Sequence, residues 1–180
     1  MRVVFLDRDG VINEDRDDYV KNVSELKVFP WTPSAVRRLN DAGFDVYVVS
    51  NQQGVAKGII SEDDLLAMQS EIVRQVKSAG GRINGFYYCR HLASDKCSCR
   101  KPEPGMLKSA AMEHGIDLAG SYMIGDSERD IIAGKVVGCH TVLVLTGKLT
   151  LGDAEAFVDA PDYVACDLSA AVDYVIGAGS

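Results

Sequence analysis

The sequence predicts an α/β protein built on a doubly wound parallel sheet with helices on both faces. Short apolar runs alternate along the chain with longer segments in which apolar residues recur at helical spacing. This alternation is typical of parallel strands joined by crossover helices, with each strand buried on both sides. Polar residues cluster directly after the apolar runs, where ligands bind in such folds.

The first half of the chain reads as strand, helix, strand, helix, strand. Val3–Leu6 is an apolar run that stops at a polar loop, which indicates a buried strand. Helical spacing begins at Pro33 and continues to a glycine, and Val46–Val49 then forms a second apolar run. The next helix should begin at Ser61, because a carboxylate three positions later allows a capping box. Phe86–Tyr88 is the third expected strand.

The second half repeats the pattern. Met106–His114 has helical spacing and ends at a glycine. Two apolar runs, Tyr122–Ile124 and Thr141–Leu145, flank the helical segment Glu128–Val137. A last short strand, a last helix and a frayed end are expected at Tyr163–Ala165, Ala170–Ile176 and Gly177–Ser180. Residues 1–180 should therefore form one domain.

Composition and charge narrow the classes of function. Hydrophobic residues make up 47% and charged residues 25%, as in ordinary globular proteins. No apolar run approaches the roughly 20 residues that span a bilayer. The N-terminus reaches charged residues too early for a secretory signal, so we expect a cytoplasmic protein without a membrane partner. The formal net charge of −7 argues against a nucleic-acid partner, because phosphate backbones are bound by clustered basic residues.

Acidic residues follow two of the expected strands. Asp7 and Asp9 come directly after the first strand, and at this spacing their side chains can point to the same side of an extended segment. Asp126 follows the strand Tyr122–Ile124. Because crowded carboxylates repel one another, they require a cation or raised pKa values. Their oxygen atoms are ligands that suit Mg²⁺.

Two other strand ends supply groups that can hold a phosphate. Ser50 and Asn51 offer a hydroxyl and an amide, and Arg100 and Lys101 offer positive charge. Each pair alone would be an ordinary turn or surface pair. Together with a nucleophilic carboxylate and a metal site, they are the parts that phosphoryl transfer requires.

Four segments resemble the four motifs of the haloacid dehalogenase-like (HAD) phosphatases. They are Phe5–Asn13 (FLDRDGVIN), Val49–Gln52 (VSNQ), Arg100–Pro102 (RKP) and Gly125–Asp130 (GDSERD). The resemblance implies the Rossmannoid sheet of that family and a magnesium-dependent phosphatase of a small phosphorylated metabolite. The chain has no insertion long enough for a cap domain, so we expect none.

The resemblance also implies roles for individual residues. Asp7 would attack phosphorus and form an aspartyl-phosphate, while Asp9 would protonate the leaving oxygen and then activate water. Ser50 and Lys101 would hold the transferring phosphoryl group. Asp130 would orient the lysine. The implied ligands of Mg²⁺ are Asp7, Asp126 and the backbone carbonyl of Asp9.

Three cysteines and a histidine lie within eleven positions after the third expected strand. In a cytosolic protein such a cluster predicts a metal site rather than disulfides. Tetrahedral Zn²⁺ accepts three thiolates and one imidazole and then keeps no open position, so the site should be structural. The loop runs directly into Arg100-Lys101 and should stiffen that segment. The expected ligands are Cys89, His91, Cys97 and Cys99.

The zinc pattern narrows the resemblance to the HAD branch that acts on heptose bisphosphates and on histidinol phosphate. Lys101–Leu107 (KPEPGML) resembles the heptose enzymes, whereas the short loop between His91 and Cys97 resembles the histidinol-phosphate enzymes. We favour the 7-phosphate of a heptose 1,7-bisphosphate and keep histidinol phosphate, or another small sugar phosphate, as the alternative. The residues expected to contact the substrate are Asp15, Arg16, Asp17, Asp18, Asn51, Gln52, Gln53 and Arg100.

Two non-enzymatic readings fit parts of the sequence. A receiver-like phospho-acceptor domain shares the clustered acids and the lysine, but Asp9 beside the nucleophile and the zinc loop oppose it. A zinc-stabilised binding module with vestigial catalytic residues is opposed by the complete set of catalytic groups. We expect a monomer, because none of the expected helices has a spare apolar face.

Overall fold

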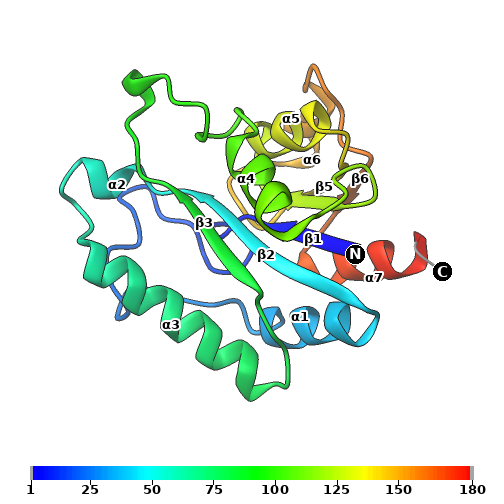
Figure 1. Cartoon of the computed structure of the whole chain (residues 1–180), viewed down its shortest axis with the longest axis horizontal. Coiled ribbons are helices and arrows are strands. Elements are labelled where there is room, and N and C mark those ends of the chain that lie inside the picture. Colours follow the sequence, from blue (N-terminus) through cyan, green and yellow to red (C-terminus); the bar gives the residue numbers. More distant parts are fainter. Residues whose placement is uncertain (1, 179–180) are drawn as a thin grey trace.

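The computed structural model describes residues 2–178 and contains one six-stranded parallel sheet. The strands lie in the order β3-β2-β1-β4-β5-β6, so the chain builds the sheet outward from β1 in two directions (Figure 1). The switch point, where ligands bind in open parallel sheets, lies between β1 and β4. The strand bounds are β1 Arg2–Leu6, β2 Phe44–Asn51, β3 Gly85–Cys89, β4 Tyr122–Gly125, β5 His140–Val144 and β6 Tyr163–Ala165.

Helices cover both faces of this sheet. In Figure 1, α1 and α3 lie below the sheet, and α4 and α5 lie above it. The helix α7 packs beside α1, on the lower face. The helical bounds are α1 Thr32–Asp41, α2 Gln53–Ala56, α3 Glu62–Ser78, the 3₁₀ turn η1 Ala93–Asp95, α4 Gly105–His114, α5 Glu128–Val136, α6 Leu151–Glu155 and α7 Leu168–Ala178.

Alternate residues of β1 enter two separate cores. Val4 and Leu6 pack in the cluster formed with α1, α3 and α7, whereas Val3 and Phe5 pack in the cluster formed with α4. All four side chains are fully buried. This is the pattern of a parallel strand covered on both faces, and it explains why the sequence shows a continuous apolar run. Because both faces of the strand are buried, polar side chains can be placed in a binding site only after its carboxyl end.

The longer helices begin and end close to the predicted residues, although α7 extends two residues beyond each end of the predicted Ala170–Ile176. Ser61 caps α3 by accepting a hydrogen bond from the backbone N–H of Asp64 at 3.0 Å. Gly43 and Gly115 follow α1 and α4 with positive φ, the conformation that glycine adopts without steric cost. The parallel sheet with helices on both faces confirms the predicted fold class.

Several short elements differ from expectation. Gln53–Ala56 is helical where a loop was expected, and Leu151–Glu155 is a helix for which the sequence analysis had no assignment. Both are too short to show helical periodicity. The last helix extends through Ala178, so Gly177 is helical rather than frayed, and residues 179–180 lie outside the described part of the chain. No helix in the described range is both long and apolar enough to cross a membrane.

Candidate active site

A cavity of about 570 Å³ opens at the carboxyl ends of the central strands. It lies at the switch point between β1 and β4, where the strand order places it. The residues named from the sequence that line it are Asp7, Asp9, Asp15, Arg16, Asp17, Ser50, Asn51, Gln53, Arg100, Lys101, Asp126 and Asp130. These residues come from segments more than 100 positions apart, and parallel pairing of the strands brings them together.

Lys101 lies buried at the centre of the site. Its Nζ is 3.0 Å from Asp7 Oδ1 and 2.6 Å from Asp130 Oδ1, and it donates a hydrogen bond to the Val49 carbonyl at 2.8 Å. Asn51 holds the lysine backbone through two reciprocal hydrogen bonds of 3.0 Å. Burial would lower the pKa of Lys101, but the two carboxylates outweigh it and raise that pKa. The lysine is therefore a fixed cation beside Asp7.

Three carboxylates and two glycines form a compact oxygen-rich cluster. One oxygen from each of Asp7, Asp126 and Asp130 lies within 4.8 Å of the others. A Cβ at Gly10 would lie 2.3 Å from Asp126 Oδ2, and one at Gly147 would lie 2.0 Å from it. Only glycine backbone leaves room for the aspartate at these two positions. Hard oxygen donors at this spacing fit Mg²⁺.

The electrostatics of the cluster also fit a divalent cation. Burial raises the pKa of Asp7 to about 6, although Lys101 acts in the opposite direction. Burial, together with the charges of Asp7 and Asp130, raises the pKa of Asp126 to about 8. A bound cation would stabilise the ionised carboxylates and so offset both the burial and the mutual repulsion that raise these pKa values.

Without magnesium, we expect the protein to lose stability as the pH rises from about 4 to about 8. The folded-state pKa of Asp126, about 8, lies above its ordinary value of 3.8, so the folded state holds the extra proton in this window. The free energy of unfolding then falls with pH, by an amount on the order of a few kcal/mol. Urea unfolding in magnesium-free buffer at several pH values measures this free energy. Millimolar Mg²⁺ should remove most of its dependence on pH. A flat stability profile would contradict the raised pKa.

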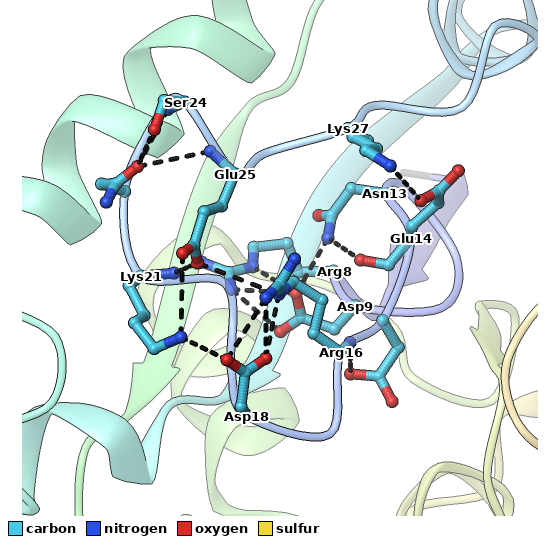
Figure 2. Close-up of polar contacts among 12 residues, drawn as sticks. Arg8, Asp9, Asn13, Glu14, Arg16, Asp18, Lys21, Ser24, Glu25 and Lys27 are labelled. Atoms are coloured by element: carbon cyan, nitrogen blue, oxygen red, sulfur yellow. Dashed lines mark hydrogen bonds and ion pairs between the residues drawn. The ribbon is translucent and has the colours of Figure 1, made fainter.

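Asp9 is held by three side chains, of which Figure 2 shows Arg8 and Asn13. Arg8 Nη2 lies 2.9 Å from each carboxylate oxygen, and Asn13 and Gln52 each donate one hydrogen bond of 2.9 Å. Burial would raise the pKa of Asp9, but these partners outweigh it and hold that pKa below its usual value. Gln52 also donates to the hydroxyl of Ser50 at 2.9 Å. Gln52 thus holds two expected catalytic residues, Asp9 and Ser50, although the sequence analysis placed it among the substrate contacts.

The four expected zinc ligands lie together at the end of β3. Cys89 Sγ is 3.6 Å from Cys97 Sγ and 3.2 Å from Cys99 Sγ, and His91 Nδ1 is 3.2 Å from Cys99 Sγ. Ligands of a tetrahedral Zn²⁺ with bonds of about 2.0–2.3 Å lie roughly 3.5–3.8 Å apart. Burial and the neighbouring thiols raise the pKa of Cys99 to about 12, so a cation is needed before three thiolates can coexist. The cluster therefore fits zinc.

Comparison with known proteins identifies the family. Residues 98–171 match the family model described as HAD-hydrolase-like. The chain is 43% identical to the D-glycero-beta-D-manno-heptose-1,7-bisphosphate 7-phosphatase of Pseudomonas aeruginosa over 81% of this chain and 82% of that protein. It is 37% identical to the D-glycero-D-manno-heptose-1,7-bisphosphate 7-phosphatase of Thermosynechococcus vestitus over 96% and 94%. The chain belongs to the HAD-like phosphatase family.

A solved structure supports the same assignment. The crystal structure of the D,D-heptose 1,7-bisphosphate phosphatase from B. bronchiseptica, complexed with magnesium and phosphate, matches with a TM-score of 0.91 and 35% identity over 99% of both chains. As a HAD-like phosphatase, the protein is a phosphoric monoester hydrolase, which confirms the predicted enzyme class. This family membership opposes the receiver-like alternative.

The rim of this HAD-like cavity carries charged pairs. Arg16 Nε donates a hydrogen bond of 3.0 Å to Asp18, which also pairs with Lys21 (Figure 2). Asp18 is therefore occupied by two cations of its own loop, whereas Arg16 lines the cavity. Gln53, the first residue of α2, donates a hydrogen bond of 3.0 Å to the hydroxyl of Tyr19 in the same loop. These contacts fix the loop that follows β1.

The sequence analysis missed several residues of the HAD-like site. Lys148, in the loop after β5, lines the cavity and lies 3.0 Å from Asp15 Oδ2 and 2.8 Å from Asp17 Oδ1. It could have been found, because it follows an expected strand end as the other site residues do. Arg129 also lines the cavity, from α5. Arg8 was part of a recognised motif but was assigned no role.

Proposed function

We propose that the protein is a magnesium-dependent phosphatase that hydrolyses the 7-phosphate of D-glycero-D-manno-heptose 1,7-bisphosphate through an aspartyl-phosphate. The observation that carries the proposal is the position of Asp7, 3.0 Å from the buried Lys101 and within 4.8 Å of carboxylate oxygens of Asp126 and Asp130. The relatives described above are named for this substrate and align with most of the chain. We treat residues 1–180 as one catalytic domain that acts as a monomer in the cytoplasm, where sugar phosphates are made and used.

The first chemical step is the attack of Asp7 on phosphorus. Lys101, 3.0 Å from the nucleophile, balances the negative charge of the transferring group. The buried hydroxyl of Ser50 donates a hydrogen bond to one of the phosphoryl oxygens and is itself held by Gln52. Mg²⁺ bound by Asp7, Asp126 and the backbone carbonyl of Asp9 would neutralise further charge on the phosphoryl group.

Asp9 moves the protons of both steps. In the first step Asp9 acts in its protonated form and gives that proton to the sugar oxygen as the bond to phosphorus breaks. The resulting carboxylate, the form that its low pKa favours, then takes a proton from the water that attacks the aspartyl-phosphate on Asp7. The carboxylate lines the cavity and is held from behind by Arg8 and Asn13. Water regenerates the free carboxylate of Asp7 and releases inorganic phosphate.

Substrate recognition falls to the rim of the cavity. The acids Asp15 and Asp17 would receive hydroxyl groups of the sugar. Arg100, whose forked guanidinium suits phosphate oxygens, would bind the second, non-reacting phosphate. Its Nη1 is buried and has no hydrogen-bond partner among the described residues. The remaining expected contacts at the rim are Arg16 and Gln53.

The deciding experiment measures phosphate release with Mg²⁺ from both anomers of the heptose bisphosphate, from histidinol phosphate and from sugar monophosphates. We expect the highest kcat/KM on one anomer of the bisphosphate. A higher kcat/KM on histidinol phosphate would replace the proposed substrate with the alternative. Failure on all of these esters would reject the proposed substrate class altogether.

We also expect about one equivalent of structural zinc, lost in the Cys99→Ser variant. Because the zinc loop leads into Arg100-Lys101, its loss should lower the free energy of unfolding by about 3 kcal/mol or more and also reduce kcat. Metal analysis, urea unfolding and phosphate release measure the three effects. Cys166→Ser is the matched control, since that exposed cysteine lies outside the cluster. Less than about half an equivalent of zinc in fresh protein would count against the site.

A further inference from the structure

Arg8 is the most deeply buried cation among the described residues. Its side chain is 1% exposed, compared with 3% for Lys101. A buried guanidinium is unfavourable unless it is paired and its donors are bonded. The partner here is Asp9: Arg8 Nε and Nη2 reach Oδ1 at 3.2 and 2.9 Å, and Nη2 reaches Oδ2 at 2.9 Å (Figure 2). The most buried cation is thus aimed at the expected acid–base group.

The donors divide unequally between the two oxygens of Asp9. Oδ1 accepts from Nε and Nη2 of Arg8 and from Asn13 Nδ2. Oδ2 accepts from Arg8 Nη2 and from Gln52 Nε2, which is shared with the hydroxyl of Ser50. Oδ1 thus accepts three hydrogen bonds and Oδ2 two, and one of the two donors on Oδ2 is shared with Ser50. Oδ2 is therefore the less strongly held oxygen of a carboxylate that lines the cavity, and the one that can more readily exchange a protein donor for a substrate.

We propose that Arg8 is a positioning residue for the phosphatase reaction, whose fork holds Oδ1 of Asp9 in the protein and presents Oδ2 to the leaving oxygen. The inference rests on the proposed function, in which Asp9 protonates that oxygen. Bidentate charge-assisted pairs fix geometry as well as energy. Because Arg8 is buried, it acts through Asp9 and not by touching the substrate. A lysine in its place would keep the charge but lose the fork.

The test compares leaving groups. A heptose phosphate releases an alkoxide, which needs a proton as it leaves, whereas p-nitrophenyl phosphate releases a stable phenolate, which does not. We measure kcat/KM because it reports transfer of the phosphoryl group to Asp7 and not the later hydrolysis. Arg8→Gln should lower kcat/KM by about 100-fold on the heptose bisphosphate. On p-nitrophenyl phosphate the loss should be at least about tenfold smaller.

A double-mutant cycle shows whether Arg8 acts through Asp9. Adding Arg8→Gln to Asp9→Asn should lower kcat/KM by less than about threefold, because no carboxylate remains to be positioned. Thr32→Val is the matched control for a general loss of stability. Thr32 is fully buried, and its hydroxyl donates a hydrogen bond to the Ile12 carbonyl. Removal of this hydroxyl should leave the ratio of kcat/KM values on the two esters unchanged. Arg8→Lys should give a ratio of kcat/KM values between those of the unaltered enzyme and Arg8→Gln. If Arg8→Gln does not fold, Arg8→Lys takes its place in the test.

The outcomes separate this inference from the proposed function. Equal losses on the two esters, or fully additive losses in the cycle, would overturn the positioning role of Arg8. If Asp9→Asn lowers kcat/KM selectively on the heptose bisphosphate but neither Arg8 variant does so, this inference alone is rejected. If Asp9→Asn keeps full activity on both esters, the proposed function is rejected.

Discussion

Replacing Asp7 by asparagine should lower kcat on every phosphate monoester by about 10⁴-fold or more. The amide has the same shape as the carboxylate but cannot form the aspartyl-phosphate. The fold should survive, because the change removes one of the crowded charges of the cluster, and Lys101 keeps its 2.6 Å contact with Asp130. Phosphate release measures the rate, and thermal unfolding checks the fold.

Asp41→Asn is the matched control for the Asp7 variant. Asp41 ends α1, is exposed and pairs only with Arg37, so this substitution should leave kcat unchanged. Rapid acid quenching of the unaltered enzyme should also trap phosphate on the peptide that contains Asp7. An Asp7→Asn variant within tenfold of the original rate would mean that another group is the nucleophile.

Lys101→Met should lower both stability and activity. The ammonium lies 2.6 Å from Asp130, whose side chain is fully buried, so its removal leaves that charge without a partner. Breaking a buried pair in this way costs about 3–5 kcal/mol of unfolding free energy. Because the same ammonium lies 3.0 Å from the nucleophile, kcat should fall by about 10³-fold. Urea unfolding and phosphate release measure the two effects.

The double variant Lys101→Met/Asp130→Asn separates the two effects. With the buried charge removed, most of the lost stability should return, since a neutral pair needs less compensation. Activity should stay low, because no cation faces Asp7. If the double variant also recovered activity, the lysine would act only by stabilising the fold, and its place in the reaction would be wrong.

The sequence predicted the sheet and the convergence of the polar groups for one physical reason. Parallel strands buried on both faces appear as apolar runs, and their carboxyl ends meet at one edge. Val3–Leu6 and Val46–Val49 could be assigned in this way, and the aspartates and the serine that follow them were then expected to be neighbours. The convergence of the four expected zinc ligands was predictable because two short segments, each with two ligands, are joined by a small loop and meet easily.

The contacts made by individual side chains could not be predicted in this way. Asn51 and Gln52 were expected to contact the substrate, yet one amide holds the Lys101 backbone and the other holds Asp9. Which partner an amide chooses depends on the groups buried around it, and spacing along the chain does not reveal them. The bridge from Lys148 to the opposite loop was missed for a similar reason, since it joins segments that only the closed fold brings together.

The central position of β1 affects how the chain folds during synthesis. The strand pairs with β2 early, but its other neighbour, β4, begins at Tyr122. Until that segment has left the ribosome, β1 presents an open edge, which favours pairing with other chains. We expect fragments that end before β4 to aggregate. The expected nucleophile Asp7 therefore follows a strand that precedes its partner β4 by more than 100 residues, and chains that end before β4 lack Asp126 and with it a complete active site.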